Sequence, residues 1–170
     1  MSRTHARSRR GFTLTETLVT LLIVSLLSMA IAVGIGAAAR VYKESVAMSE
    51  SQLLASTLSK AMMDELRYAR ELPDTAADNP AFDSSTFGSG VQFSTDAATG
   101  QLKLGSYYLV SSGAYSTNTD QHKRAEAQVQ WTGSQFQVTL TIFLGETRVL
   151  NTVEFTVTPL NPPKPSETTS

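Results

Sequence analysis

The sequence contains no cysteine and only two histidines among its 170 residues. Without cysteine, disulfides, thiolate metal sites and cysteine-linked lipid anchors are excluded. His5 lies in a basic N-terminal segment and His122 in a polar stretch, so a multi-histidine metal site is excluded and a catalytic triad could use only His122. Phosphate-binding glycine loops and the Gly-x-Ser-x-Gly elbow are also missing. We therefore expect no enzymatic activity, no metal and no cofactor.

The residues after the first eleven carry no excess of basic side chains. Those eleven hold four of the 14 Lys and Arg and none of the 15 Asp and Glu. The remainder therefore has 10 basic against 15 acidic residues, a net charge of −5. Domains that bind nucleic acid carry a basic patch on their folded part, so we expect no nucleic-acid partner.

Charge is absent altogether from Thr17 to Ala39. A helix over these residues would be about 35 Å long at about 1.5 Å per residue, enough for a hydrocarbon core of roughly 30 Å. The basic residues 1–11 before it are typical of a leader that stays in the cytoplasm. Glu16 stands at the start of the run, where a carboxylate is costly and marks a functional site. Its interaction with the helix dipole, about 0.3–1 kcal/mol, is too small to explain it.

The residues Gly11-Phe12-Thr13-Leu14-Thr15-Glu16 join the basic leader to the apolar run. This combination resembles the class III signal of type IV pilins and of the related pseudopilins of type II secretion and competence systems, over about residues 8–39. The resemblance implies that a prepilin peptidase cuts between Gly11 and Phe12 and methylates the new amine of Phe12. It also implies that Glu16 pairs with the amino terminus at Phe12 of a neighbouring subunit during assembly.

The apolar run differs from that of many major pilins because it contains no proline. Gly34 and Gly36 occupy the same general region, and each costs a helix roughly 1 kcal/mol relative to alanine. Two interpretations stay open: the glycines loosen the helix in a filament, or they permit close helix packing. The missing proline favours a minor pilin or a pseudopilin.

A second interpretation starts from Ser8-Arg9-Arg10-Gly11-Phe12, which also resembles a twin-arginine export signal, with Ala37-Ala38-Ala39 as a cleavage site. The mature chain would then be a soluble exported β-domain, a binding protein that starts near Arg40. A third interpretation is a signal-anchored monomer that never polymerises.

The stretch from Arg40 to Leu72 continues the helix, because no proline or glycine interrupts it before Pro73. We expect one helix from about Phe12 to Leu72, amphipathic in its second half. Apolar residues at helical spacing predict the face that packs on a sheet: Val46, Leu54, Leu58, Met62, Leu66 and Ala69.

The stretch from Pro73 to Gly90 predicts a loop, since Pro, Asp, Asn, Ser and Gly dominate it. Its acidic residues do not fit a calcium loop, so solvated carboxylates are expected. Two strands, Val91 to Ser94 and Leu102 to Val110, flank a turn at Asp96 to Gly100. A polar surface loop follows from Ser111 to Lys123.

Three further strands are expected as an antiparallel meander. Alternating apolar and polar residues indicate strands over 127–131, 136–142 and about 147–158, with turns at Gly133 and Gly145. For Trp131 and the Tyr107-Tyr108 pair, packing in the core or on the sheet face is expected rather than ligand binding.

The predicted fold is α+β, a long N-terminal helix packed on an antiparallel β-sheet, as in pilins. The predicted parts are a basic leader (1–11), a hydrophobic transmembrane and assembly helix (12–39), an amphipathic continuation (40–72), an exported β-domain (73–158) and a disordered tail (159–170). We expect a single-pass cytoplasmic (inner) membrane protein whose C-terminal domain lies outside and which then enters an extracytoplasmic filament. The expected partners are prepilin peptidase, other pilin or pseudopilin subunits, the membrane and the inner-membrane assembly platform.

Overall fold

A computed structural model describes residues 13–115 and 122–160. The leader, Gly11 and Phe12, most of the predicted polar loop and the tail from residue 161 lie outside the described residues. The chain divides into two compact units, residues 1–44 and 45–170. Together its elements make an α+β fold, with one long N-terminal apolar helix and antiparallel sheets.

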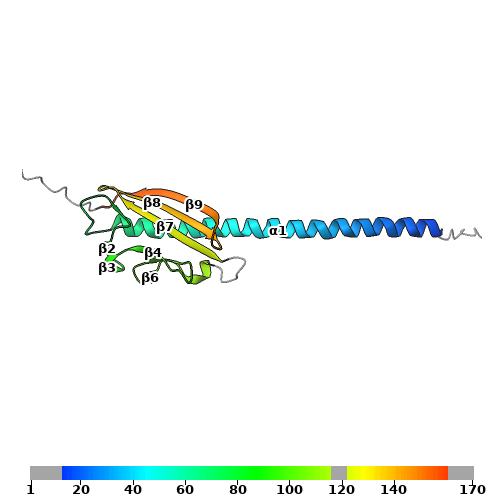
Figure 1. Cartoon of the computed structure of the whole chain (residues 1–170), viewed down its shortest axis with the longest axis horizontal. Helices are drawn as coiled ribbons and strands as arrows, with labels where there is room; N and C mark the ends of the chain where they lie inside the picture. The colour runs from blue at the N-terminus through cyan, green and yellow to red at the C-terminus, as the bar shows by residue number, and fades with distance from the viewer. Residues whose placement is uncertain (1–12, 116–121, 161–170) are drawn as a thin grey trace, which may run out of the picture. The chain divides into compact units, whose positions relative to one another are not determined.

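Helix α1 runs from Leu14 to Arg67 without interruption (Figure 1). Among the described residues it is the one helix long and apolar enough to cross a membrane, and no residue of its most apolar window is buried. A core helix of a soluble protein would bury such a window instead. None of the described residues thus covers the apolar surface of this segment.

The helix ends at Arg67, so the prediction that it continues to Leu72 is wrong. Arg70 leaves the helix because its backbone pairs with that of Asp83, N–H to carbonyl in both directions at 3.0 and 2.9 Å. Glu71 then adopts a left-handed conformation with φ 51°. Pro73 was the only stop signal in the sequence, whereas a long-range backbone pairing ends the helix earlier.

The main sheet contains the predicted meander. Strands β7 (Lys123–Trp131), β8 (Phe136–Leu144) and β9 (Arg148–Val157) pair antiparallel in sequence order. A short strand, β1 (Ala77–Asp78), pairs with β7 and gives the order β1-β7-β8-β9. The meander is therefore confirmed, and β7 begins four residues before the predicted start.

The predicted loop from Pro73 to Gly90 is wrong, because it contains β1, β2 (Phe82–Ser84) and most of β3 (Gly88–Val91). Asp74 and Asp78 are exposed, as expected for solvated carboxylates, whereas other polar side chains of this segment hold the chain in place. The Asp83 carboxylate accepts the N–H of Gly90 at 2.8 Å. The Ser84 hydroxyl donates to the Glu65 carboxylate of α1 at 2.6 Å and thereby ties this hairpin to the helix.

The predicted single strand from Leu102 to Val110 is also wrong. The chain turns at Gly105, φ 61°, between β5 (Leu102–Leu104) and β6 (Tyr107–Tyr108). Strand β4 (Phe93–Thr95) pairs with the other edge of β5, through the predicted turn at Asp96 to Gly100. A short 3-10 helix, η1 (Ser112–Ala114), follows.

Tyr107 and Tyr108 are 55% and 47% exposed, so they pack on the surface of the sheet and not in the core. The Tyr107 ring contacts Phe87 with centroids 5.4 Å apart, and Lys103 Nζ lies 5.8 Å from the centre of the Tyr108 ring. The tight turn at Gly105 carries β6 to the outer edge of its sheet, where both rings meet solvent. Trp131 behaves as predicted, since it is buried, packs on Phe136 with ring centroids 4.8 Å apart, and donates its indole N–H to the Pro73 carbonyl at 2.8 Å.

The core lies where the second part of α1 meets the sheets, and Figure 1 shows β7, β8 and β9 across that part of the helix. The predicted apolar face is confirmed from Leu54 onward, whereas Val46 is only half-buried. Each fully buried Leu or Met contributes about 1.5–3 kcal/mol. The core residues from the helix and the segment that follows it are Leu54, Ala55, Leu58, Met62, Leu66, Ala69 and Leu72.

A cluster around Asp96 fixes the turn between β4 and β5. The Asp96 carboxylate accepts the Tyr108 hydroxyl at 2.7 Å and the Ala98 N–H at 2.9 Å, and lies 3.7 Å from Lys103 Nζ. These hydrogen bonds, Tyr108 first, hold the pKa of Asp96 below its ordinary value. The same contact raises the pKa of Tyr108.

Tyr108→Phe should raise the pKa of Asp96 toward its ordinary value, because the strongest interaction with the ionised form is lost. Since the folded pKa is lowered, this carboxylate stabilises the fold fully above about pH 4 and ceases to do so as the pH falls through the folded pKa. An NMR titration of the Asp96 carboxyl carbon measures the shift. An unchanged pKa in the variant would show that Tyr108 does not hold the charge.

Candidate functional site

The candidate site at the N-terminus of α1 is built from its first turn. Thr13 precedes the helix and accepts the backbone N–H of Glu16 on its hydroxyl oxygen at 3.3 Å, while its carbonyl accepts from Glu16 and Thr17 at 3.0 and 3.2 Å. Thr13 is thus the N-cap, which satisfies donors that the first turn leaves free. The cap fixes Glu16 as the third helical residue.

Glu16 lies in this first turn and is exposed, as the sequence predicted. Within the described residues its carboxylate makes no hydrogen bond or ion pair. Gly11 and Phe12, the predicted processing residues, lie outside the described residues. Their roles stay predictions.

The surface around Glu16 is apolar on all sides of the helix. Every residue of α1 from Leu14 to Ser45 is exposed, with only short hydroxyl side chains for polarity until Arg40. The hydroxyls of Thr17, Thr20, Ser25 and Ser28 donate to carbonyls one turn back at 2.7–2.8 Å. These bonds hide their polarity inside the helix, so the segment can face hydrocarbon without unsatisfied donors.

Gly34 and Gly36 lie inside α1, and a Cβ added at either would meet nothing within 4 Å. No close approach within the described chain therefore requires glycine at these positions. Neither predicted role, loosening of the helix or close packing with another helix, is decided by the chain alone.

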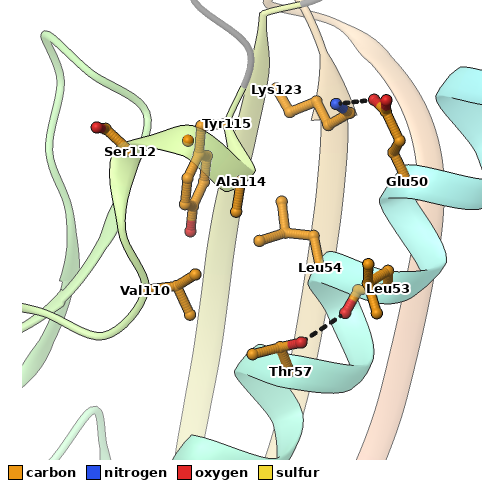
Figure 2. Close-up of a pocket in the computed structure, with 10 residues that line it drawn as sticks. Glu50, Leu53, Leu54, Thr57, Val110, Ser112, Ala114, Tyr115 and Lys123 are labelled. Atoms are coloured by element: carbon orange, nitrogen blue, oxygen red, sulfur yellow. Dashed lines mark hydrogen bonds and ion pairs between the residues drawn. The ribbon is translucent and has the colours of Figure 1, made fainter.

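A cavity of about 580 Å³ lies in the second unit, between α1 and the segment that carries η1 (Figure 2). Leu53, Leu54 and Thr57 of α1 form one wall, and Val110 and Tyr115 lie on the other. Two polar groups of the cavity have internal partners. Thr57 donates to the Leu53 carbonyl at 2.9 Å, and the Tyr115 hydroxyl accepts the Leu102 N–H at 3.2 Å.

Lys123 closes one end of this cavity, where its ammonium meets the Glu50 carboxylate at 2.5 Å (Figure 2). The Lys123 side chain is 2% exposed and the Glu50 side chain 47%. The predicted surface loop thus ends in a buried residue, since Lys123 opens β7 and faces the helix. The ion pair joins α1, near the start of its part in the second unit, to the start of β7.

No group of three or more metal-ligating side chains occurs in the described residues. Of the loop residues considered for calcium, Asn79 and Asp83 hold backbone groups: Asn79 donates to the Phe93 carbonyl at 3.0 Å, and Asp83 accepts from Gly90. His122 lies half-buried at the start of β7, and its carbonyl accepts the Gly145 N–H at 2.8 Å.

Comparison with known proteins shows which known motif the N-terminal segment matches. The family described as the prokaryotic N-terminal methylation motif matches residues 6–32. The chain carries the class III signal of type IV pilin-like proteins. No curated protein and no solved structure matches it.

The motif supports a type IV pilin-like substrate of a prepilin peptidase, and it implies peptidase processing and pilin assembly. The matched residues cover the last six residues of the leader, the N-cap, Glu16 and 16 of the 23 residues of the apolar run from Thr17 to Ala39. The motif is that of a structural family, not an enzymatic one. Together with the apolar helix it fits a membrane-anchored protein.

The surroundings of three residues were not predicted from the sequence: Thr13, Lys123 and Ser59. Thr13 and Glu16 have the Thr-x-x-Glu spacing of a capping box, which was readable as a helix start. Lys123 continues the alternation of β7 two residues before buried Ala125, so its inward direction was readable too. The Ser59 hydroxyl is buried without a hydrogen-bond partner in the described chain. No sequence pattern indicated this, because its burial depends on the sheet.

Glu50→Ala should destabilise the pilin-like chain by about 1–3 kcal/mol, because it leaves the buried Lys123 ammonium without its acceptor. Lys123→Met should cost less, since it removes the buried charge and keeps an apolar stem. Urea unfolding of the detergent-solubilised chain, followed by the fluorescence of its one tryptophan, the buried Trp131, measures both. A larger loss for Lys123→Met than for Glu50→Ala would contradict this account.

Proposed function

We propose that the chain is a minor pilin or pseudopilin, a structural subunit of a type IV pilus, type II secretion or competence filament. The observation that carries the proposal is the methylation motif at residues 6–32, which continues directly into a helix segment with no buried residue. A helix that is apolar all round must be covered by lipid or by other helices. A subunit that leaves the membrane for a filament uses the same surface for both.

The proposed topology places the leader in the cytoplasm and the second unit, residues 45–170, outside. The leader's four arginines and lack of acidic residues support this direction of insertion. The residues that follow the apolar run bring charge back at Arg40, Lys43 and Glu44. Cleavage before the apolar run, between Gly11 and Phe12, leaves the anchor attached to the mature chain.

Glu16 is proposed to set the register between subunits. Its exposed carboxylate has no internal partner in the described chain, and an unpaired charge in hydrocarbon is costly. The methylated amine of Phe12 on a neighbouring subunit would supply the opposite charge near the membrane surface. Bundled apolar helices would then supply the adhesion, and the ion pair the alignment.

The alternative, a soluble β-domain released after Ala37-Ala38-Ala39, has less support. These residues lie in the middle of α1, which continues for 28 residues beyond Ala39. Helical residues are poor protease substrates, because cleavage needs an extended backbone. Buried residues Ala47 and Ser51 also follow shortly after the site, so the helix beyond it belongs to the folded unit.

Gly11→Val should block processing, since the peptidase would no longer find its small residue before the scissile bond. The variant should stay in membranes with residues 1–11 attached, at least tenfold less processed than the parent chain by intact mass. Ser8→Ala is the matched control in the same leader and should mature normally. Normal maturation of the Gly11 variant, or a mature chain that begins at Arg40, would refute the proposed cleavage.

Glu16→Ala should still lose its leader but enter filaments about tenfold less, equivalent to roughly 1.4 kcal/mol per subunit contact. Quantitative immunoblotting of sheared filaments against the membrane pool measures the ratio. Glu16→Asp keeps the charge and should assemble better than Glu16→Ala. Equal incorporation of parent chain and Glu16→Ala would eliminate the register role while leaving the cleavage prediction intact.

A further inference from the structure

The apolar run of α1 ends in four exposed residues, Arg40, Val41, Tyr42 and Lys43, which we call the 40–43 band. All four belong to the first unit. Val41 and Tyr42 are 64% and 71% exposed. Because an α-helix has about 3.6 residues per turn, four consecutive residues go once around it, with Tyr42 on the side opposite Arg40. The band therefore surrounds the helix at one level.

The two cations of the 40–43 band are unpaired in the described chain. The side chains of Arg40 and Lys43 make no hydrogen bond or ion pair with another described residue. Glu44, the next charged residue, already has an interaction of its own. The band thus carries two exposed positive charges for which the described residues supply no counter-charge.

The 40–43 band matches the headgroup layer of a membrane in thickness. A bilayer is about 30 Å thick in its hydrocarbon core and about 40–45 Å with its headgroups, which leaves about 5–8 Å for the headgroups on each side. Four helical residues rise about 6 Å. The uncharged run from Thr17 to Ala39, directly before the band, is long enough to fill the hydrocarbon. The first buried residue of α1 is Ala47, beyond the band.

The side chains of the band suit a headgroup layer. Tyrosine is enriched at both membrane–water interfaces, because its ring is apolar and its hydroxyl is polar. Arginine and lysine lay their apolar stems along lipid and keep the charge among the headgroups. A guanidinium binds phosphate through two parallel N–H donors, and an ammonium binds it as a point charge. The band therefore combines an aromatic anchor with two phosphate-binding groups.

We propose that the 40–43 band binds the headgroups of anionic phospholipids on the side of the membrane opposite the leader, and thereby fixes the depth of α1. Arg40 and Lys43 contact phosphate oxygens, and Tyr42 lies among the headgroups on the other side of the helix. Zwitterionic lipids bind less well, because their own ammonium group opposes the two cations. The inference rests on the membrane anchoring proposed above and adds a lipid class as a partner.

A second copy of the chain is a poorer partner for the band than lipid. The acidic residues of the first unit are Glu16 and Glu44. Glu16 is 24 residues before Arg40, about 36 Å along the helix, and Glu44 already has an interaction. A neighbour whose helix lies at the same level in the membrane therefore brings no free carboxylate to the band. Lipid headgroups, in contrast, surround a membrane helix on every side, as the band does.

The lipid preference is measured with the full chain in phosphatidylcholine vesicles that contain a trace of spin-labelled phosphatidylglycerol or spin-labelled phosphatidylcholine. Electron paramagnetic resonance gives the fraction of each labelled lipid that the protein slows. The parent chain should slow phosphatidylglycerol more. Arg40→Gln with Lys43→Gln should reduce this preference at least twofold. Each cation at a membrane surface favours anionic lipid about fivefold, but only part of the slowed lipid touches the band.

The matched control is Lys60→Gln with Arg67→Gln. It removes the same charge from exposed positions of the same helix, in the second unit, and should leave the preference unchanged. The arginines of the leader are present in every variant, so their contribution to lipid binding cancels in the comparison. The fluorescence of the buried Trp131 during thermal unfolding verifies that all variants are folded.

The depth of α1 is measured separately. The chain has no cysteine, so Ala38→Cys carries a single nitroxide label two residues before the band. In the parent chain, oxygen dissolved in the hydrocarbon should reach this label well and a polar nickel chelate poorly. Adding Arg40→Gln and Lys43→Gln should let the helix sink further, because cations resist entry into lipid, and should reduce chelate access at least twofold.

Three results would overturn the proposal. If the 40 and 43 variant keeps its preference for phosphatidylglycerol, or the 60 and 67 control loses it equally, the band does not bind anionic headgroups. If the preference is lost but the depth of residue 38 is unchanged, the band does not fix the depth. If the chelate reaches residue 38 as freely as a label in water, the membrane segment and the proposed topology fail together. Cleavage at Gly11, read by intact mass, depends on none of these results.

Discussion

The folded unit depends on one contact, the burial of the apolar stripe of α1 against the sheets. Leu54, Leu58, Met62 and Leu66 are each at most 2% exposed and stand on one face of the helix. No disulfide assists them, since the chain has no cysteine, so this packing must offset the conformational entropy of the unit. The Glu50–Lys123 and Glu65–Ser84 contacts lie at either side of the stripe and fix where the sheets sit along the helix.

The same helix has a different surface over its first thirty residues, which are all exposed among the described residues. One continuous helix thus has a fully exposed apolar part and a part that packs on the sheets. The two parts differ in their side chains and not in their backbone. Hydroxyls there bond back to the helix, and the first charge after Glu16 is Arg40. Glu16 is the charged residue at the start of this otherwise uncharged stretch, just after the Thr13 cap. We propose that a partner from outside the chain pairs with this charge.

The sequence predicted the apolar run, the position of Glu16, the amphipathic stripe and the three-stranded meander, because each follows from the order of residues within a short window. It failed where distant segments meet. Arg70 leaves the helix to pair with Asp83, and Ser84 reaches Glu65. One strand was predicted from Leu102 to Val110, but Gly105 turns the chain within it and carries Tyr107 and Tyr108 to the surface. The segment from Pro73 to Gly90 is rich in loop-forming residues, and its short strands exist because the rest of the fold offers partners.

By itself the sequence determined the methylation motif, since that motif is a short linear pattern that runs from the basic leader into the uncharged run. It also determined the fold class, because the periods of 3.6 and 2 residues are local properties. Only the tertiary structure decided which polar groups are satisfied. Lys123 acquired a partner on α1, and Ser59 was buried without one in the described chain. Hydrogen bonding of buried groups depends on which segments lie side by side, and no local pattern contains that information.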